Sequence, residues 1–216
     1  ANAAIAGLAA VGCRVIDVGV VATPSVAVMI NHHPPARGMG ITASHNPIQW
    51  NGLKCLNADG VAPPPEVANR IIARFKDKDF DRVPDDRVPK SSRDDSANQR
   101  HVQRVLVAVD PAPIRAAKFK VVLDSVNGGG CVSGRVLLDA LGCEVVHING
   151  EPTGRFAHTP GPTAENLDEL MEPTKRERAA CGFAQDPDAD RLAIVDENGT
   201  YFGEEYTLVL AAKRML

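Results

Sequence analysis

Apolar residues occur in short runs separated by longer mixed segments, a pattern typical of an α/β fold. The short runs predict strands over residues 15–20, 38–42, 54–56, 121–124, 144–148, 182–184 and 192–195. Apolar residues at helical spacing predict helices over 3–11, 23–31, 66–75, 101–118, 131–141 and 165–178. The strand–loop–helix–strand order after residue 120 favours a parallel pairing with a right-handed crossover.

Residues at the ends of these segments support the assignment. Gly12 and Gly142 follow apolar helical patterns and are expected to end helices. Thr23 is predicted as an N-cap, with Pro24 at the first helical position. Residues 197–199, Glu-Asn-Gly, predict a hairpin turn.

Residues 77–100 are highly charged and nearly lack an apolar pattern, so they are predicted to form an exposed connector. Two α/β units in tandem are therefore expected, one on each side of it. The chain begins in one apolar helical pattern and ends in another, at residues 208–212, so we expect it to be part of a longer protein.

Composition narrows the function classes. The chain has 216 residues, of which 44% are hydrophobic, enough to bury a core. A net charge of −3 gives no electrostatic footprint for nucleic acid or an anionic membrane. No apolar run approaches the ~20 residues that span a bilayer. The five cysteines are odd in number and widely spaced, which argues against a disulfide framework or zinc site and fits a reducing cytoplasm.

The first candidate site is the loop at residues 42–47, Thr-Ala-Ser-His-Asn-Pro, directly after a predicted strand. Ser44 needs a base or a charged environment to react, and His45, Lys54 and Arg191 are candidate partners. The glycines of a nucleophile elbow are missing, so a serine hydrolase is disfavoured. An ordinary polar turn made by Asn46 remains the alternative.

The second candidate is residues 186–191, Asp-Pro-Asp-Ala-Asp-Arg, between two predicted strands. In an extended segment Asp186, Asp188 and Asp190 would share one face. Three carboxylates together repel unless a cation offsets them, and oxygen ligands suit Mg²⁺. A solvated acidic loop is the alternative. An EF-hand calcium loop that starts at Asp186 is rejected, because Arg191 occupies its sixth position, where that loop needs glycine.

A glycine-rich segment, residues 127–130, lies between a predicted strand and helix. It matches neither a dinucleotide fingerprint nor a P-loop. A phosphate cradle at the helix N-terminus is possible, and a structural tight turn is the preferred interpretation.

Taken together, these motifs resemble those of the α-D-phosphohexomutase family, which includes phosphoglucosamine mutases and phosphomannomutase/phosphoglucomutases. The resemblance is carried in collinear order by residues 42–47 with 51–54, 124–130, 156–167 and 186–191. It implies two tandem three-layer α/β/α domains with mixed, mostly parallel sheets: domain 1 over residues 1–110, domain 2 over 111–200, and the start of domain 3 over 201–216.

The resemblance also implies roles for the candidate residues. Ser44 would be the phosphoserine, and its phosphate would complete a Mg²⁺ site made by Asp186, Asp188 and Asp190. Lys54, Arg191 and His45 would surround the transferring phosphoryl group. The substrate would be a hexose phosphate, with a hexose 1,6-bisphosphate as activator and intermediate. Neither nucleic acid nor a membrane is implied as a partner, and the oligomeric state stays open.

Family members usually have four domains, and the sugar-recognition loop of the third and the phosphate-binding loop of the fourth are absent from this sequence. The chain is therefore expected to be a partial fragment with low or no activity. Two alternatives remain: a non-catalytic phosphosugar-binding domain of the same fold, and a metal-dependent phosphatase. The phosphatase would leave the Ser44 loop unexplained.

Overall fold

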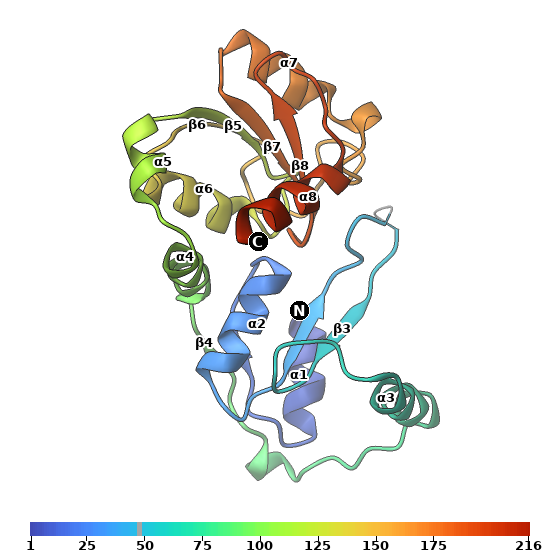
Figure 1. The fold of residues 1–216 in the computed structure, drawn as a ribbon. Helices are drawn as coiled ribbons and strands as arrows, with labels where there is room; N and C mark the ends of the chain where they lie inside the picture. The colour runs from blue at the N-terminus through green and yellow to red at the C-terminus, as the bar shows by residue number, and fades with distance from the viewer. Residues whose placement is uncertain (47–48) are drawn as a thin grey trace.

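The computed structural model describes residues 1–46 and 49–216, and it forms two lobes joined through helices (Figure 1). The N-terminal lobe contains α1 (Asn2–Ala10), β1 (Ile16–Asp17), α2 (Thr23–His32), β2 (Gly38–Ile41), β3 (Leu53–Leu56), α3 (Pro65–Asp77), η1 (Asp85–Arg87) and β4 (Ser92–Arg93). Helices α4 (Ala97–Ala108) and α5 (Ala112–Ala117) follow. The C-terminal lobe contains β5 (Lys120–Asp124), α6 (Cys131–Ala140), β6 (Glu144–Ile148), η2 (Ala164–Asn166), α7 (Asp168–Arg176), β7 (Cys181–Gln185), β8 (Leu192–Asp196) and α8 (Glu204–Met215).

The C-terminal lobe is built on a four-stranded sheet in the order β6-β5-β7-β8. Strands β6, β5 and β7 are parallel, and β8 is antiparallel to β7. Side chains alternate between the two faces of β5: Val122 joins the core that contains Leu170 of α7, whereas Leu123 approaches Gly134 of α6. Helices therefore cover both faces, and the predicted three-layer α/β class with a mixed, mostly parallel sheet is confirmed.

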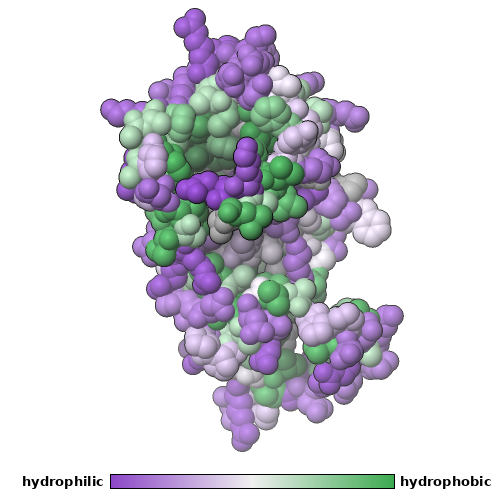
Figure 2. All heavy atoms as spheres, in the orientation of Figure 1, coloured by the Kyte–Doolittle hydropathy of each residue, from purple (hydrophilic) through white to green (hydrophobic). Residues whose placement is uncertain are grey.

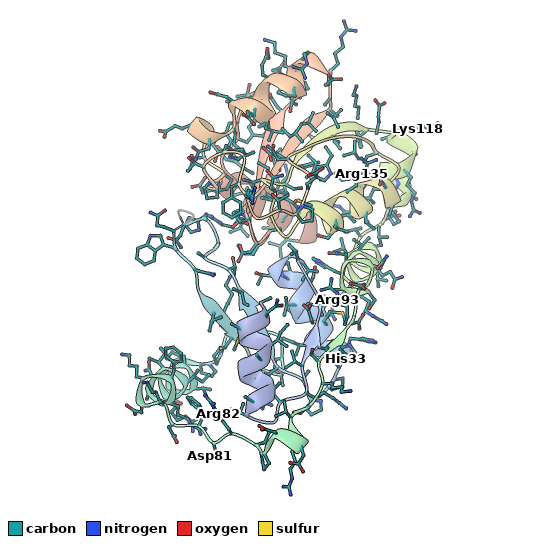
Figure 3. The ribbon with its side chains drawn as sticks, turned by 180° about the vertical axis from the view of Figure 1, so that it is seen from behind. His33, Asp81, Arg82, Arg93, Lys118 and Arg135 are labelled. Carbon is teal, nitrogen blue, oxygen red and sulfur yellow. The ribbon has the colours of Figure 1, made fainter. Side chains whose placement is uncertain are left out.

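The N-terminal lobe holds two separate two-stranded sheets. Strands β1 and β4 are parallel, and β2 and β3 are antiparallel. Polar side chains hold β4 and the residue after it: Arg93 donates to Asp17 at 2.9 Å, and His33 lies 3.0 Å from Asp94. Arg93 and His33 lie on the same side of this lobe (Figure 3).

Two predictions about the middle of the chain were wrong. Residues 77–100 are not only a connector, because η1 and β4 lie within them and α4 begins there. The helix expected over 101–118 is two helices, α4 and α5, since Pro111 lacks the N–H that would continue the first. The break turns the chain toward β5, where the second lobe starts.

The prediction that Thr23 is the N-cap of its helix was also wrong. Ala22 is the N-cap of α2, and Thr23 and Pro24 are its first two residues. No side-chain cap bond forms at this helix end, because the Thr23 hydroxyl bonds to Asp188 in the other lobe.

Surface features complete the description. Helix α8 exposes the apolar side chains of Leu208, Val209 and Leu210. Hydrophobic residues gather over this helix near the middle of the face in Figure 2. All five cysteines are free in the structure. Within the described residues, no helix is both long and apolar enough to cross a membrane.

Candidate active site

The Ser44 loop follows β2 and meets the acid loop of the C-terminal lobe. Ser44 has a left-handed backbone, φ 52°, and its N–H donates to the Thr42 hydroxyl at 2.8 Å, which fixes this turn. The Ser44 hydroxyl donates to Asp186 Oδ2 at 3.1 Å, and His45 Nδ1 lies 3.3 Å from the same hydroxyl. His45, one of its three candidate partners, therefore lies beside Ser44. Pro47, the last residue of the motif, lies outside the described residues.

The acid loop joins β7 to β8 as a turn. Ala189 has φ 52°, and its N–H donates to the Asp186 carbonyl at 2.9 Å. The segment is thus not extended, and the expectation that alternation alone places the acids on one face was wrong. The turn nevertheless gathers them: one carboxylate oxygen each from Asp186, Asp188 and Asp190 lie within 4.8 Å of one another.

Asp186 is fully buried and held by the loop itself. Its Oδ1 accepts the backbone N–H groups of Asp190 and Arg191, both at 3.2 Å. Its Oδ2 accepts the Arg191 guanidinium at 3.4 Å in addition to the Ser44 hydroxyl. Burial, followed by the charge of Asp188, raises the pKa of Asp186. Arg191 is thereby placed beside Ser44 through the carboxylate that both contact.

Lys54 of β3 crosses to the same loop. Its ammonium donates to Asp188 Oδ2 at 2.8 Å and lies 3.5 Å from Asp190 Oδ2. Burial lowers the pKa of Lys54, but the hydrogen bond and charge of Asp188 outweigh burial, and the net pKa is raised. Burial likewise opposes ionisation of Asp188, and Lys54 reverses this, so that the pKa of Asp188 is lowered. The pair is charged at neutral pH.

The geometry of the acid loop fits a divalent cation. Oxygen atoms around one octahedral Mg²⁺ lie about 3–4 Å apart, so the three carboxylates need little adjustment. Asp188 Oδ1 is buried and has no hydrogen-bond partner among the described residues. An unsatisfied buried carboxylate oxygen is costly unless a cation binds it. Asp190, by contrast, is exposed and leaves the loop open on one side.

The glycine-rich turn packs against the acid loop and against the segment just before α2. A Cβ on Gly128 would lie 2.8 Å from Pro187 Cα, and one on Gly129 would lie 2.5 Å from the Val21 carbonyl oxygen. The Gly129 N–H donates to the Pro187 carbonyl at 2.7 Å. The segment thus has the predicted role of a tight turn, and glycine is needed because neighbouring backbone approaches so closely.

A cavity of about 1060 Å³ opens beside the site and extends into the N-terminal lobe. Its lining includes Ser44, Asp188 and the glycine-rich turn. This volume is at the upper end of the usual range for small-molecule sites.

Sequence reasoning missed two polar residues. Thr23 contacts Asp188 from the other lobe, and its only sequence signal was the helix start. Asp124, at the carboxyl end of β5, is buried and lies 2.9 Å from His158. Its position at a strand end, where α/β sheets place functional groups, was the available signal.

Two family models match the chain, and both describe phosphoglucomutase/phosphomannomutase. The model of α/β/α domain I covers residues 1–82, and that of α/β/α domain II covers residues 99–199. This chain belongs to the phosphoglucomutase/phosphomannomutase family. The family assignment drawn from the serine and acid motifs is thereby confirmed.

Individual members of the family agree with this assignment. A "probable phosphoglucosamine mutase" of Methanopyrus kandleri is 37% identical over 99% of this chain. A "phosphoglucomutase/phosphomannomutase" of Thermococcus kodakarensis is 37% identical over all of it. A crystal structure of a family protein from Burkholderia thailandensis covers 97% of this chain and 46% of its own, with 28% identity and a TM-score of 0.76. The chain spans about half the length of these relatives, 47% of each of the first two.

Proposed function

We propose that this chain carries the part of a phosphohexomutase active site that holds the phosphoserine and the cation. A phosphohexomutase is an isomerase that interconverts hexose 6-phosphate and hexose 1-phosphate. The observation that supports it most directly is the 3.1 Å contact of the Ser44 hydroxyl with Asp186, 142 residues away and in the other lobe. A binding module would have no need to bring a serine, a lysine and three carboxylates together.

In the proposed cycle, the bond between phosphorus and the Ser44 oxygen breaks as the phosphoryl group passes to a free hydroxyl of a hexose monophosphate, and the proton of that hydroxyl passes to the released Ser44 oxygen. The bisphosphate then turns over in the cleft and returns its other phosphoryl group to the Ser44 oxygen. Lys54 and Arg191 would offset the charge of the moving group, since such transfers depend on positioning and electrostatics. His45 is the proposed proton-transfer partner because its Nδ1 lies 3.3 Å from the Ser44 hydroxyl.

The acid loop would hold Mg²⁺ through Asp186, Asp188 and Asp190, with a Ser44 phosphate oxygen completing the site. When bound, the ion would supply positive charge that stabilises the phosphoryl group. A hexose 1,6-bisphosphate would phosphorylate Ser44. We propose glucosamine phosphate as the first substrate to test, followed by mannose phosphate or glucose phosphate. The proposed location is the cytoplasm, and no nucleic-acid or membrane partner is proposed.

We also propose the domain division expected from the sequence. Residues 1–110, 111–200 and 201–216 would belong to three successive domains of the phosphohexomutase. Because the curated relatives are about twice as long, we propose that this part alone turns over slowly or not at all.

Peptide mass spectrometry of Ser44, before and after incubation with Mg²⁺ and glucose 1,6-bisphosphate, tests the proposal. We expect phosphate on the Ser44 peptide, and none in Ser44→Ala. Ser91→Ala, at an exposed serine of the connector, is the matched control and should leave the labelling unchanged. Absence of label in the protein, also when the missing domains are supplied, would refute it. Phosphate-ester hydrolysis that Ser44→Ala leaves unchanged would instead favour the phosphatase.

A further inference from the structure

Thr23 makes two hydrogen bonds to one residue of the acid loop. Its backbone N–H donates to the Asp188 carbonyl at 2.8 Å, and its hydroxyl donates to Asp188 Oδ2 at 3.0 Å. Thr23 is the first residue of α2, where the backbone N–H has no partner within the helix. The start of this helix therefore holds both the main chain and the side chain of Asp188.

The two oxygens of Asp188 have different surroundings. Oδ2 accepts from the Thr23 hydroxyl and from the Lys54 ammonium, at 3.0 and 2.8 Å. Oδ1 is buried and accepts from no donor among residues 1–46 and 49–216. With two donors fixed on one oxygen, the carboxylate cannot rotate freely, and Oδ1 stays the oxygen without a donor.

We propose that Thr23 is a positioning residue of the cation site, which fixes Asp188 Oδ2 so that Oδ1 is presented to the ion. The inference rests on the proposed function, because it takes the acid loop to be a cation site. Residues that orient metal ligands through hydrogen bonds commonly determine affinity although they never touch the metal. Thr23 belongs to the N-terminal lobe, so the affinity of the acid loop depends on how the two lobes are docked.

Two substitutions separate positioning from simple packing. Thr23→Val keeps the shape of the side chain and the backbone N–H but removes the hydroxyl, whereas Thr23→Ser keeps the hydroxyl and removes the methyl group. Packing would suffer from the serine variant at least as much as from the valine variant. Positioning would suffer only from the valine variant. Thr159→Val, at an exposed threonine, controls for the exchange itself.

The experiment titrates each purified protein with Mn²⁺ and follows the free aqueous ion by electron paramagnetic resonance, with Mg²⁺ as competitor. Near-ultraviolet circular dichroism checks that each variant is folded. Thr23→Val should weaken Mn²⁺ binding about tenfold, and Thr23→Ser should stay within about twofold of the wild type. Asp188→Asn should abolish binding, which assigns the signal to the acid loop.

The outcomes distinguish the two proposals. If the wild type binds Mn²⁺ at the acid loop but Thr23→Val weakens binding less than about threefold, only the role of Thr23 is refuted. The role of Thr23 is also refuted if Thr23→Ser binds Mn²⁺ as weakly as Thr23→Val does. If the wild type binds no Mn²⁺ that depends on Asp188, the cation site itself is wrong, and the role of Thr23 fails with it.

Discussion

At the scale of single residues, Asp188 is held by two partners from outside its own loop. Thr23 and Lys54, from two elements of the N-terminal lobe, both donate to one of its oxygens. Its carboxylate is nearly inaccessible, with 5% of the side chain exposed. A buried carboxylate of this kind is stable only when cations and donors surround it.

Removal of the Lys54 charge is therefore expected to destabilise the protein in the absence of a divalent ion. Lys54→Met leaves Asp188 buried without its cation, and we expect the free energy of unfolding to fall by about 1–2 kcal/mol, since Lys54 itself is partly exposed. Added Mg²⁺ should restore part of this loss by replacing the missing charge. Urea unfolding with and without Mg²⁺ measures both effects. Lys90→Met, at an exposed lysine, is the control, and equal stability of the two variants would contradict the prediction.

His158 is a second residue whose charge matters, and its two ring nitrogens both face acceptors. Nδ1 lies 2.9 Å from the Thr159 carbonyl and Nε2 lies 2.9 Å from Asp124 Oδ2. A neutral imidazole has one N–H and could satisfy only one of them. The hydrogen bond to Asp124 raises the pKa of His158 and outweighs burial, which lowers it. The folded protein therefore favours the doubly protonated ring.

This sets the sign of a pH dependence. The folded pKa exceeds the unfolded one, so the stabilisation is complete below the ordinary histidine pKa of about 6.5 and is lost as pH rises through the folded value. The difference in unfolding free energy between wild type and His158→Gln should be largest near pH 5.5 and shrink toward pH 9. Urea unfolding across this range measures it, with His32→Gln at an exposed histidine as control. A difference that grows with pH would show that the ring is neutral in the folded state.

At the scale of elements, the glycine-rich turn before α6 determines how closely the acid loop and the segment before α2 can approach it. Gly128 and Gly129 do not have positive φ values, so their role here is one of space rather than of backbone freedom. Gly128 faces Pro187 of the acid loop, and Gly129 faces Val21 just before α2. The turn is thus wedged between the acid loop and the N-terminal lobe.

Gly128→Ala should push the acid loop away, because the new Cβ would meet the backbone of Pro187, which cannot move as a side-chain end could. We expect a loss of about 1–3 kcal/mol in unfolding free energy, as for other overpacked sites, together with weaker Mn²⁺ binding. Thermal and urea unfolding and the Mn²⁺ titration measure these. Gly7→Ala in α1, where nothing lies within 4 Å of the added Cβ, should cost nothing. A Gly128→Ala protein as stable and as tight-binding as the wild type would refute the wedge.

At the scale of the whole molecule, the site exists only where the two lobes meet. Helix α4 packs against α2 of one lobe and α6 of the other, and Ser25 of α2 lies 2.9 Å from His101 of α4. The lobes thus approach each other through helices as well as through the Ser44 and acid loops. Ligands that bind such an interface stabilise the docked, folded state by mass action.

Mg²⁺ should therefore raise the melting temperature of the protein. At a hundred times the dissociation constant, the added stability would be about 2.7 kcal/mol. Differential scanning calorimetry over a Mg²⁺ series measures the shift, and chelation should reverse it. Asp188→Asn should melt at the same temperature with and without Mg²⁺. Asp59→Asn, in an exposed turn, should still respond as the wild type does. A shift that persists in Asp188→Asn would place the ion elsewhere.

The sequence by itself determined the features that depend on neighbouring residues. Hydrophobic periodicity located most helices and all the described strands except β4, because burial of one face follows directly from spacing. Motif chemistry selected Ser44, Lys54, Arg191 and the three aspartates, and the structure brings all of them together. The family followed from the same motifs.

Only the tertiary structure decided what depends on the docking of distant segments. The acid loop gathers its carboxylates through a turn, and α2 bonds to Asp188 across 165 residues, neither of which any local pattern predicts. The break between α4 and α5 is different, because it follows from Pro111 and is therefore a local feature of the sequence. The physical reason is that local sequence sets backbone preference and burial, whereas the partners of a buried polar group are set by whichever chain segments packing brings beside it.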